Sequence, residues 1–445
     1  MSELTTKRLA AWIAIAIPPI AFYVLLACSL TKLPFADDYD SVLNYLLKWK
    51  SESGLQHIAQ IITSQHNEYR LIFENTIFGI QFAIMGHTNL EFLSILGDLF
   101  VIPLFGVLYL IWRDFGNSWD FALFAFIPTS WLLFQLQYAS TLNCAMNPLQ
   151  SVPVICFMLL TCWLAVKPSR AIFAACLLSL VLCISSSGNG LFMIPIGCLI
   201  FLQRKQHSRL VVWLAVSGVM SIVYFAGYSV RASSSDAHHN VINSVRHISL
   251  GYGAAFLGSI ATKANPAPAI ALSVILVVLF LFATHDRLFV RNPALYYSSL
   301  FFFVTGLAVS GIRSDRGLVT ALGSRYRINS TVLVILLYFY LADKFRDVRL
   351  KRPVGIVCVS LAGIILLGFT CESDKGGEAL LLLRRQKVRD AISRWQRHES
   401  QPPVVPRGPD DFTVENDKKG MYEPNVPILV EAIRGGIYQL PEPLD

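Results

Sequence analysis

Long apolar runs recur along most of the 445 residues of the chain. A helix of about twenty apolar residues spans the hydrocarbon core of a bilayer, and several runs reach that length. Charged residues make up only 15% of the chain, below the level of about 25% that is usual in soluble proteins. Barrel strands would instead alternate apolar and polar residues. The sequence therefore predicts an all-α polytopic membrane protein.

The net charge of +8 raises the question of a nucleic-acid partner. The basic residues, however, fall mostly in short loops between apolar runs, as orientation signals do, so we expect no nucleic-acid partner. The nine cysteines form no CxxC pair and no zinc spacing, and no metal site is expected from them. Cys144 and Cys371 are the two that we expect to meet an oxidising compartment.

One threading places every short basic loop in the cytoplasm. It predicts about 11 transmembrane helices. The predicted spans are 9–31, 91–112, 119–138, 151–166, two short helices within 171–202, 210–228, 269–284, 294–311, 329–342 and 353–370. The membrane domain is thus 1–370. A periplasmic tail, 371–445, follows it and contains an amphipathic helix at 378–398.

The predicted outer loops are 32–90, 138–150, 229–268 and 311–330. The piece 71–86 is apolar but contains Glu74, Asn75 and Gln81, so we interpret it as an interfacial or re-entrant helix. The segment 171–202 is too short for two full spans. We expect its Gly-rich tip, "SSSGNG", to lie below the outer surface, covered by protein or a water-filled cavity.

Three acids, Asp37, Asp38 and Asp40, follow the first span in "FADDYD". Acids near a helix start are favoured by the helix dipole, which is the structural alternative. The next residues carry an apolar stripe, so the acids open an amphipathic helix that lies flat at the membrane surface. We interpret Asp38 or Asp37 as a candidate base, with a slight preference for Asp38, and Asp40 as structural.

Other unusual polar residues also lie in the outer segments. "QHNEYR" combines a histidine, an acid and an arginine, which suits an anion-and-hydroxyl site, although an ordinary polar loop is the alternative. Several arginines lie on the outer side against the positive-inside trend, which favours anion binding over an orientation role; salt bridging with Asp315 is the alternative. The candidate binding residues are His66, Glu68, Arg70, Asn189, Arg313, Arg316, Arg325 and Tyr326.

An acid pair directly after the first span, a flat helix and broken helices around "SSSGNGL" resemble the GT-C glycosyltransferases. "QHNEYR", "SSGNGL" and "GSRYRINS" are similar to segments of bacterial GT-C-like proteins, some of them grouped with O-antigen glucosyltransferases of serotype-converting phages. The architectural resemblance covers roughly residues 9–370 and leaves the tail out. The acid-pair motif is short, and its place after the first span gives it weight.

The resemblance implies an inverting transfer of a sugar, glucose or another hexose, from a polyprenyl-phosphate donor to a glycan or lipid-linked acceptor such as O-antigen. A carboxylate, Asp37 or Asp38, would be the base, and outer arginines would stabilise the phosphate. No cofactor is required with certainty; some relatives use a divalent cation, Mg²⁺ or Mn²⁺. The implied location is the bacterial inner membrane, with the N-terminus cytoplasmic and with the site and C-terminus periplasmic.

Two other functions fit parts of the pattern. An O-antigen polymerase or ligase also uses outer arginines on lipid-linked sugars, and the acid pair would then be incidental. A lipid or sugar transporter (flippase) would carry charged residues inside its spans, and Asp98 is the clearest such residue. The sequence contains no Walker loop, dinucleotide fingerprint, GxSxG or HExxH motif.

Overall fold

The computed structural model describes residues 3–30, 32, 34, 37–51, 54–66, 69–142, 144–229, 249–314, 317–345 and 425–439. The described chain is almost entirely helical, which confirms the predicted all-α membrane class. Seven helical segments of this part are long and apolar enough to cross a membrane: Thr5–Ser29, Leu90–Arg113, Trp119–Tyr138, Met146–Ala165, His207–Phe225, Pro266–His285 and Pro293–Arg313. The count of about 11 spans stays a prediction.

The elements follow one another in this order. The first part contains α1 (Glu3–Ser29), a π-helical turn η1 (Tyr39–Asn44), α2 (Tyr45–Ser51), α3 (Leu55–Ile62), β1 (Gln65–His66), β2 (Tyr69–Arg70) and α4 (Ile72–Met85). The middle contains α5 (Leu90–Leu99), α6 (Val101–Arg113), α7 (Trp119–Leu133), η2 (Leu136–Tyr138), α8 (Ala139–Leu142), α9 (Met146–Ala165), α10 (Arg170–Ser186), η3 (Gly188–Phe192), α11 (Met193–Gln203) and α12 (His207–Phe225). The last part contains α14 (Leu250–Leu257), η4 (Ser259–Ala261), α15 (Pro266–His285), α16 (Leu288–Arg291), α17 (Pro293–Arg313), η6 (Leu318–Leu322), α18 (Ser324–Phe345) and α21 (Asn425–Arg434).

Helix α1 stays continuous although it contains two consecutive prolines, at 18 and 19. Each proline lacks an N–H and so leaves the carbonyl four residues earlier without its helical partner. Helix α7 supplies both missing donors: Trp131 Nε1 donates to the Ala14 carbonyl (3.1 Å) and Ser130 Oγ to the Ile15 carbonyl (2.7 Å). The two substitute hydrogen bonds explain why the first span packs on α7.

Several predicted boundaries shift toward longer helices. Helix α9 begins at Met146 instead of 151, α17 extends to Arg313, and α18 begins at Ser324 instead of 329. The outer loops 138–150 and 311–330 are correspondingly shorter than predicted. Polar side chains in these added helical turns make hydrogen bonds with other elements. A prediction of span boundaries from apolar residues alone therefore leaves these turns out of the helices. The two short helices around "SSSGNG" are present as α10 and α11, joined by η3.

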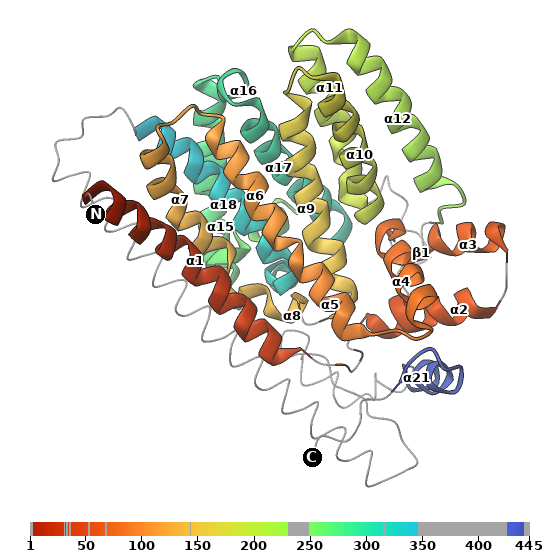
Figure 1. The fold of residues 1–445 in the computed structure, drawn as a ribbon. Helices are drawn as coiled ribbons and strands as arrows, with labels where there is room; N and C mark the ends of the chain where they lie inside the picture. The colour runs from red at the N-terminus through yellow and green to blue at the C-terminus, as the bar shows by residue number, and fades with distance from the viewer. Residues whose placement is uncertain are drawn as a thin grey trace.

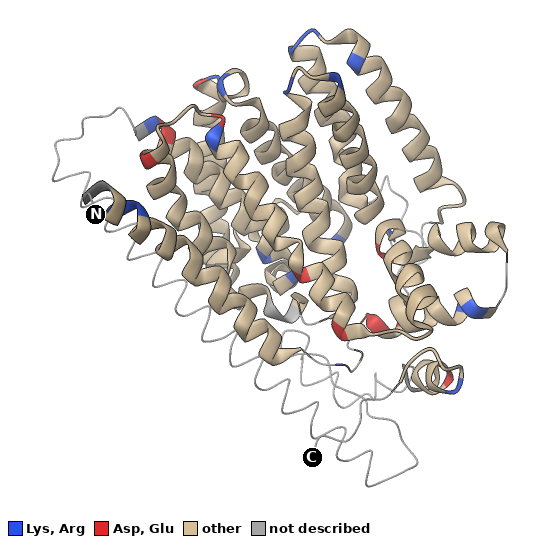
Figure 2. Ribbon diagram, viewed as in Figure 1, with Lys and Arg blue, Asp and Glu red and all other residues tan. Residues whose placement is uncertain are grey.

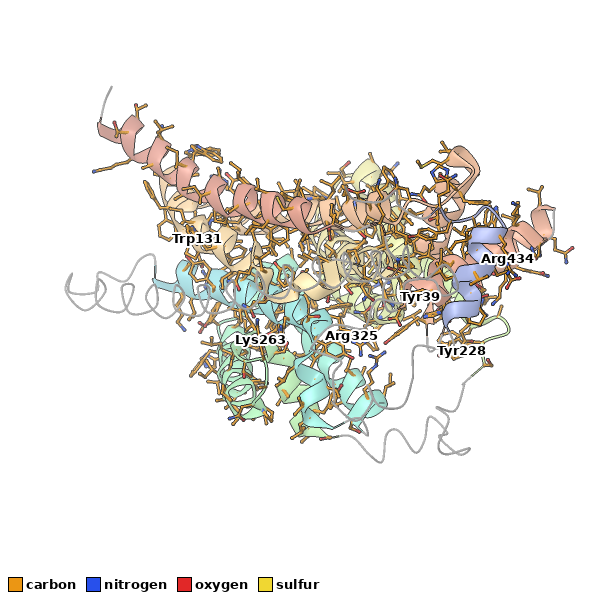
Figure 3. The ribbon with its side chains drawn as sticks, turned by 90° about the horizontal axis from the view of Figure 1, so that it is seen from below. Tyr39, Trp131, Tyr228, Lys263, Arg325 and Arg434 are labelled. Atoms are coloured by element: carbon orange, nitrogen blue, oxygen red, sulfur yellow. The ribbon has the colours of Figure 1, made fainter. Side chains whose placement is uncertain are left out.

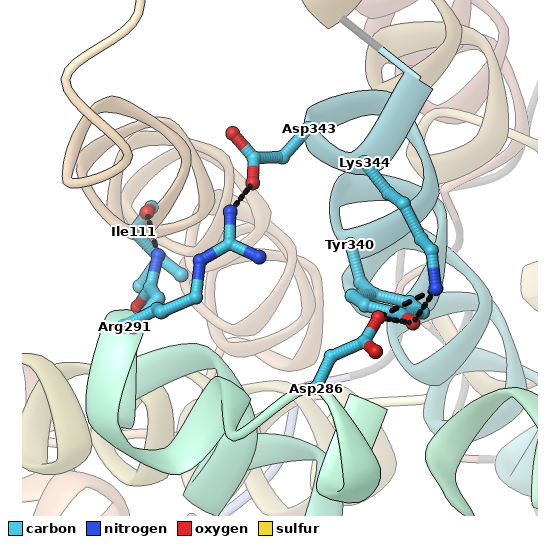
Figure 4. A network of polar contacts seen from close by, with 7 residues as sticks. Ile111, Asp286, Arg291, Tyr340, Asp343 and Lys344 are labelled. Atoms are coloured by element: carbon cyan, nitrogen blue, oxygen red, sulfur yellow. Dashed lines mark hydrogen bonds and ion pairs between the residues drawn. The ribbon is translucent and has the colours of Figure 1, made fainter. Parts of the chain in front are cut away.

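Basic loops meet at one end of the bundle, which we call the ion-pair end (Figure 2). Its ion pairs are Arg8–Asp120, Lys167–Asp114, Arg291–Asp343 and Lys344–Asp286. The last two join α18 to the loop before α17, where Tyr340 also donates to Asp286 (Figure 4). These loops are the ones that the sequence assigns to the cytoplasm.

The opposite end, which we call the hairpin end, carries the β1–β2 hairpin, the starts of α9 and α18 and the ends of α12 and α17. Helices α2, α3 and α4 form a layer there below α9, α10 and α12, and α21 lies beside it (Figure 1). This layer has its own apolar core, separate from that of the long helices.

Helix α4 has 14 residues and is not among the seven candidate spans, in keeping with the interfacial prediction for 71–86. The predicted span 353–370 and the amphipathic helix 378–398 lie outside the described residues.

Candidate functional site

Asp37 and Asp38 stand at the start of η1, the turn that follows the exit of α1; we call residues 37–44 the acid turn. The Ser41 amide donates to the Asp37 carbonyl at 2.8 Å, and the chain then winds as a π-helix through Asn44. π-Helical turns are rare and occur frequently at functional sites. The apolar residues of the turn, among them Tyr39, Val42 and Leu43, are buried in the core of the α2–α4 layer.

Asp38 is buried, with 1% of its surface exposed. Its Oδ1 accepts hydrogen bonds from the Met146 amide (3.1 Å) and from the Cys144 thiol (3.0 Å). Burial, and then the Asp38 charge, raises the pKa of the Cys144 thiol well above its usual range. Cys144 is therefore a buried donor, which corrects the expectation that it meets an oxidising compartment. Asp38 anchors the acid turn to the start of α9, whereas Asp37 is partly exposed.

Asp40 and His66 form a second polar contact of the acid turn. Asp40 Oδ2 lies 3.2 Å from His66 Nδ1, and the other ring nitrogen, Nε2, lies 3.2 Å from Ser41 Oγ. The hydrogen bond with His66 is the main cause that lowers the pKa of Asp40 to about 2, against the opposing effect of burial. Because Asp40 and Ser41 hold both ring nitrogens, the orientation of His66 is fixed against the acid turn. The predicted structural role of Asp40 agrees with this contact.

The side chains on the two faces of the hairpin contact different parts of the protein. Gln65 pairs with Arg70 and His66 with Tyr69 in the antiparallel register, and side chains of cross-strand pairs lie on the same face. Gln65 and Arg70 both bind the end of α12. Gln65 makes hydrogen bonds with the backbone of Ser229, and Arg70 donates to backbone carbonyls of α12 and of the residue after it. His66 and Tyr69 instead contact the acid turn and the end of α17.

Arg70, predicted to bind phosphate, is occupied by backbone groups. It is 6% exposed, and Nη1 donates to the Thr63 carbonyl (2.8 Å) and the Val223 carbonyl (3.4 Å), while Nη2 donates to the Ala226 carbonyl. A cation at the carbonyl end of a helix is favoured by the unpaired carbonyls and the dipole. In this structure Arg70 joins α3 to α12 and does not present its guanidinium to a ligand.

Arg313, at the end of α17, contacts two tyrosines. Its Nη1 donates to the Tyr326 hydroxyl at 2.5 Å, and its Nη2 donates to the Tyr69 hydroxyl. Arg325, in the first turn of α18, lies over the Tyr326 ring at 5.1 Å and is exposed. The structure therefore brings Arg313, Arg325 and Tyr326 together, as predicted, and adds Tyr69. We call these four residues the arginine cluster.

The phenol of Tyr326 lies in a strongly cationic environment. Burial raises the pKa of this phenol, but the charges of Arg325 and Arg313 outweigh burial, and its pKa is lowered overall. Tyr252 of α14 lies beside it, with its own hydroxyl 3.2 Å from Thr320 Oγ1. Two guanidinium groups around one phenol, as the described residues have them here, form an arrangement that suits an anion.

Gly188 places the Gly-rich tip against the hairpin. A Cβ atom on Gly188 would come within 2.8 Å of the Tyr224 hydroxyl and 3.4 Å of the Tyr69 ring, so only glycine fits here without movement. The adjacent Asn189 keeps a buried Oδ1 for which the described residues offer no hydrogen-bond donor.

The hairpin joins the acid turn to the arginine cluster. His66 of the hairpin contacts Asp40 of the acid turn, and Tyr69 of the hairpin is itself a member of the cluster through its contact with Arg313. Figure 3 shows the molecule from the hairpin end, with Tyr39 of the acid turn, Arg325 and Tyr228 labelled. Glu68 and Arg316 lie outside the described residues. Tyr69 is the residue that the prediction missed; the two-residue alternation of a hairpin would have paired it with His66. Met146 and Cys144 carry no local signal of their contact with Asp38.

Among the residues that the structure describes, no group of three or more His, Cys, Asp or Glu side chains could hold a metal ion. Asp38 Oδ1 accepts from a thiol and an amide, a donor set that fits a carboxylate anchor better than a cation ligand.

No protein-family model matches the chain, and a search of curated proteins finds no match either.

Proposed function

We propose that the chain is a GT-C-like membrane glycosyltransferase that moves a sugar from a polyprenyl-phosphate donor to a glycan or lipid-linked acceptor. The observation that carries this proposal is the hairpin, in which His66 contacts Asp40 of the acid turn and Tyr69 contacts Arg313, at one end of an apolar bundle. Sugar transfer from a lipid phosphate requires these two charges: a base for the acceptor and cations for the leaving phosphate.

In the proposed reaction, the acceptor hydroxyl oxygen forms a bond to the anomeric carbon while the bond from that carbon to the phosphate oxygen breaks. Asp37, the partly exposed acid, takes the hydroxyl proton, and the phosphate leaves with the bonding electron pair. Arg325 is exposed and keeps its guanidinium available to the phosphate oxygens. Asp38 is the anchor of the turn, and so the base assignment moves from the preferred Asp38 to Asp37.

The membrane setting follows from the two ends of the bundle. The ion-pair end holds the basic loops and is proposed to face the cytoplasm, as the positive-inside rule requires. The hairpin end then faces the periplasm of a bacterial inner membrane, at the depth where a polyprenyl phosphate presents its sugar. The described C-terminal residues lie at this same end.

The direct test is incubation of the purified protein with polyprenyl-phosphate hexoses and candidate acceptors, with products read by mass. Asp37→Asn is expected to lower the turnover by about 10²–10⁴-fold, the usual contribution of a general base. Asp114→Asn, the same change at the ion-pair end, is the matched control and should leave turnover unchanged. No transfer by the intact protein to any acceptor would count against the proposal. Full activity of Asp37→Asn would instead favour the polymerase or ligase alternative.

A transporter of lipid-linked sugar is the second candidate, and one observation favours it. Asp98 lies within the candidate span Leu90–Arg113, is 1% exposed, and has both carboxylate oxygens without a hydrogen-bond partner among the described residues. An ionisable residue inside a span often marks a transport path. Two results together would favour this function. The original protein would move lipid-linked sugar across the membrane of vesicles without transferring it, and Asp98→Asn would lose this movement.

A further inference from the structure

The C-terminal segment, residues 425–439, packs on the acid turn although nearly 390 positions separate them in the sequence. Leu429, Ala432 and Ile437 are fully buried in the core of the α2–α4 layer, together with Tyr39 and Cys144. Burial of apolar side chains away from water is the main favourable contribution to packing of this kind. The segment is therefore an integral part of this core and not a loose tail.

A tight helix end directs the last residues of the segment into this core. Gly436 has φ +65°, the left-handed conformation that ends many helices. Its amide donates to the Ile433 carbonyl (3.0 Å), and the Ile437 amide donates to the Ala432 carbonyl (2.9 Å). This is the hydrogen-bond pattern of a Schellman motif. It turns the chain so that Ile437 and Tyr438 are both buried.

Three hydrogen bonds tie the segment to three separate pieces of chain. Tyr438 donates to the Lys32 carbonyl at 2.9 Å, at the exit of α1. The Thr88 amide donates to the Ile437 carbonyl at 2.7 Å, and Lys50 Nζ to the Gly435 carbonyl at 2.7 Å. The segment thus fixes the chain on both sides of Asp37 and Asp38. The Tyr438 phenol also lies close enough to Asp38 for the carboxylate charge to contribute, after burial, to a raised pKa of the phenol.

We propose that residues 425–439 are a positioning element of the acid turn, with Tyr438 as the positioning residue. The segment keeps Asp38 in contact with Met146 and Cys144 and thereby holds Asp37 at one place at the hairpin end. Its role in turnover rests on the proposed function, whereas its effect on the structure of the turn can be measured without any activity.

The structural test uses the Cys144 thiol, which is buried next to Asp38, in the full chain with Cys28 and Cys371 changed to serine. Loosening the segment with Leu429→Ala and Ile437→Ala is expected to speed maleimide labelling of Cys144 at least about tenfold, because labelling follows the population of the open form. Glu431→Ala, an exposed change in the same helix, is the control and should not alter labelling. Equal labelling rates in all three proteins overturn the proposal.

Cys156, buried in the bundle core, reports whether the rest of the protein stays folded. If Cys156 also becomes reactive in the double variant, the result for Tyr438→Phe decides whether the segment positions the acid turn. This substitution removes only the hydrogen bond to the Lys32 carbonyl. The proposal requires faster Cys144 labelling with unchanged Cys156 labelling in this milder variant. Unchanged labelling of both thiols contradicts it.

The activity test separates positioning from general stability. Tyr438→Phe is expected to lower kcat by roughly tenfold with the donor KM unchanged, since misplacing a reacting group affects the chemical step more than binding. A changed KM with normal kcat contradicts the proposal. If the unmodified protein transfers no sugar, the proposed function fails, and the labelling result still decides the role of the segment.

Discussion

The two ends of the bundle use charge in different ways. At the ion-pair end, four pairs of opposite charges lie together, among them Lys167–Asp114 at 2.8 Å. At the hairpin end, besides the Asp40–His66 contact, charged groups also bind neutral ones: Asp38 accepts from a thiol and an amide, Arg70 donates to carbonyls and Arg313 to phenols. Pairing cancels charge, whereas neutral partners hold a charge in place and leave its field in the site. The first arrangement suits orientation and stability, and the second suits chemistry on a charged substrate.

The largest difference between the ends should appear when one cation is removed from each. Arg70→Ala breaks three contacts to carbonyls and is expected to cost about 2–4 kcal/mol of stability, because hydrogen bonds to charged groups are strong and the carbonyls stay buried. Lys167→Ala, which breaks a partly exposed ion pair, should cost less than about 1 kcal/mol. Unfolding in a denaturing detergent measures both. Equal costs would erase the distinction between the ends.

Removal of an exposed arginine should affect activity at one end only. Arg325→Gln is expected to lower sugar transfer by about 10²-fold, the usual loss when one charge-stabilising donor is removed. Its melting temperature should not change, since the side chain is exposed. Arg204→Gln, an exposed arginine at the ion-pair end, is the control and should transfer sugar normally. If both variants lose activity equally, the arginine cluster has no special role.

Glu74 tests how burial of a carboxyl group without a hydrogen-bond partner among the described residues affects the free energy of unfolding. It is 0% exposed, and neither carboxylate oxygen has a hydrogen-bond partner among the described residues. Burial raises its pKa well above the usual 4.5, so the folded protein keeps a proton that the unfolded chain releases as pH rises through 4.5. Stability from this site is therefore full below that pH and falls above it.

Glu74→Gln is neutral at every pH and should lack this decline. We expect the variant and the original protein to be similarly stable at low pH, and the variant to be more stable by about 1–2 kcal/mol near pH 8. Unfolding curves at several pH values check the result. Parallel pH dependence in the two proteins would show that Glu74 has a partner in the folded state.

The smallest expected effect concerns Gly436 at the end of α21. Gly436→Ala places a Cβ on a residue with φ +65° and should cost about 1 kcal/mol, the usual penalty of that conformation. Gly106 lies inside α6, where an added Cβ meets nothing within 4 Å. Gly106→Ala should therefore be neutral or slightly stabilising. A stabilising Gly436→Ala would contradict the helix end described here, and melting curves measure both changes.

The sequence by itself determined the membrane class, most helix positions and the segments that carry the candidate site. Apolar runs must form helices in a bilayer because no water satisfies their backbone groups. For this reason 119–138 coincides with the segment Trp119–Tyr138. The acids after α1, the "QHNEYR" segment and the arginines around α17 and α18 were also found from local composition.

Only the tertiary structure decided which of these residues meet. Asp38 is buried by Met146 and Cys144, more than a hundred positions away, and the acid turn is covered by a segment near the end of the chain. Arg70 and Tyr69 are adjacent, yet one binds backbone and the other contacts Arg313, because successive residues of a strand face opposite ways. Local periodicity reports which face of an element is apolar. The partner of a polar group depends on how distant elements pack, and no local pattern in the sequence carries that information.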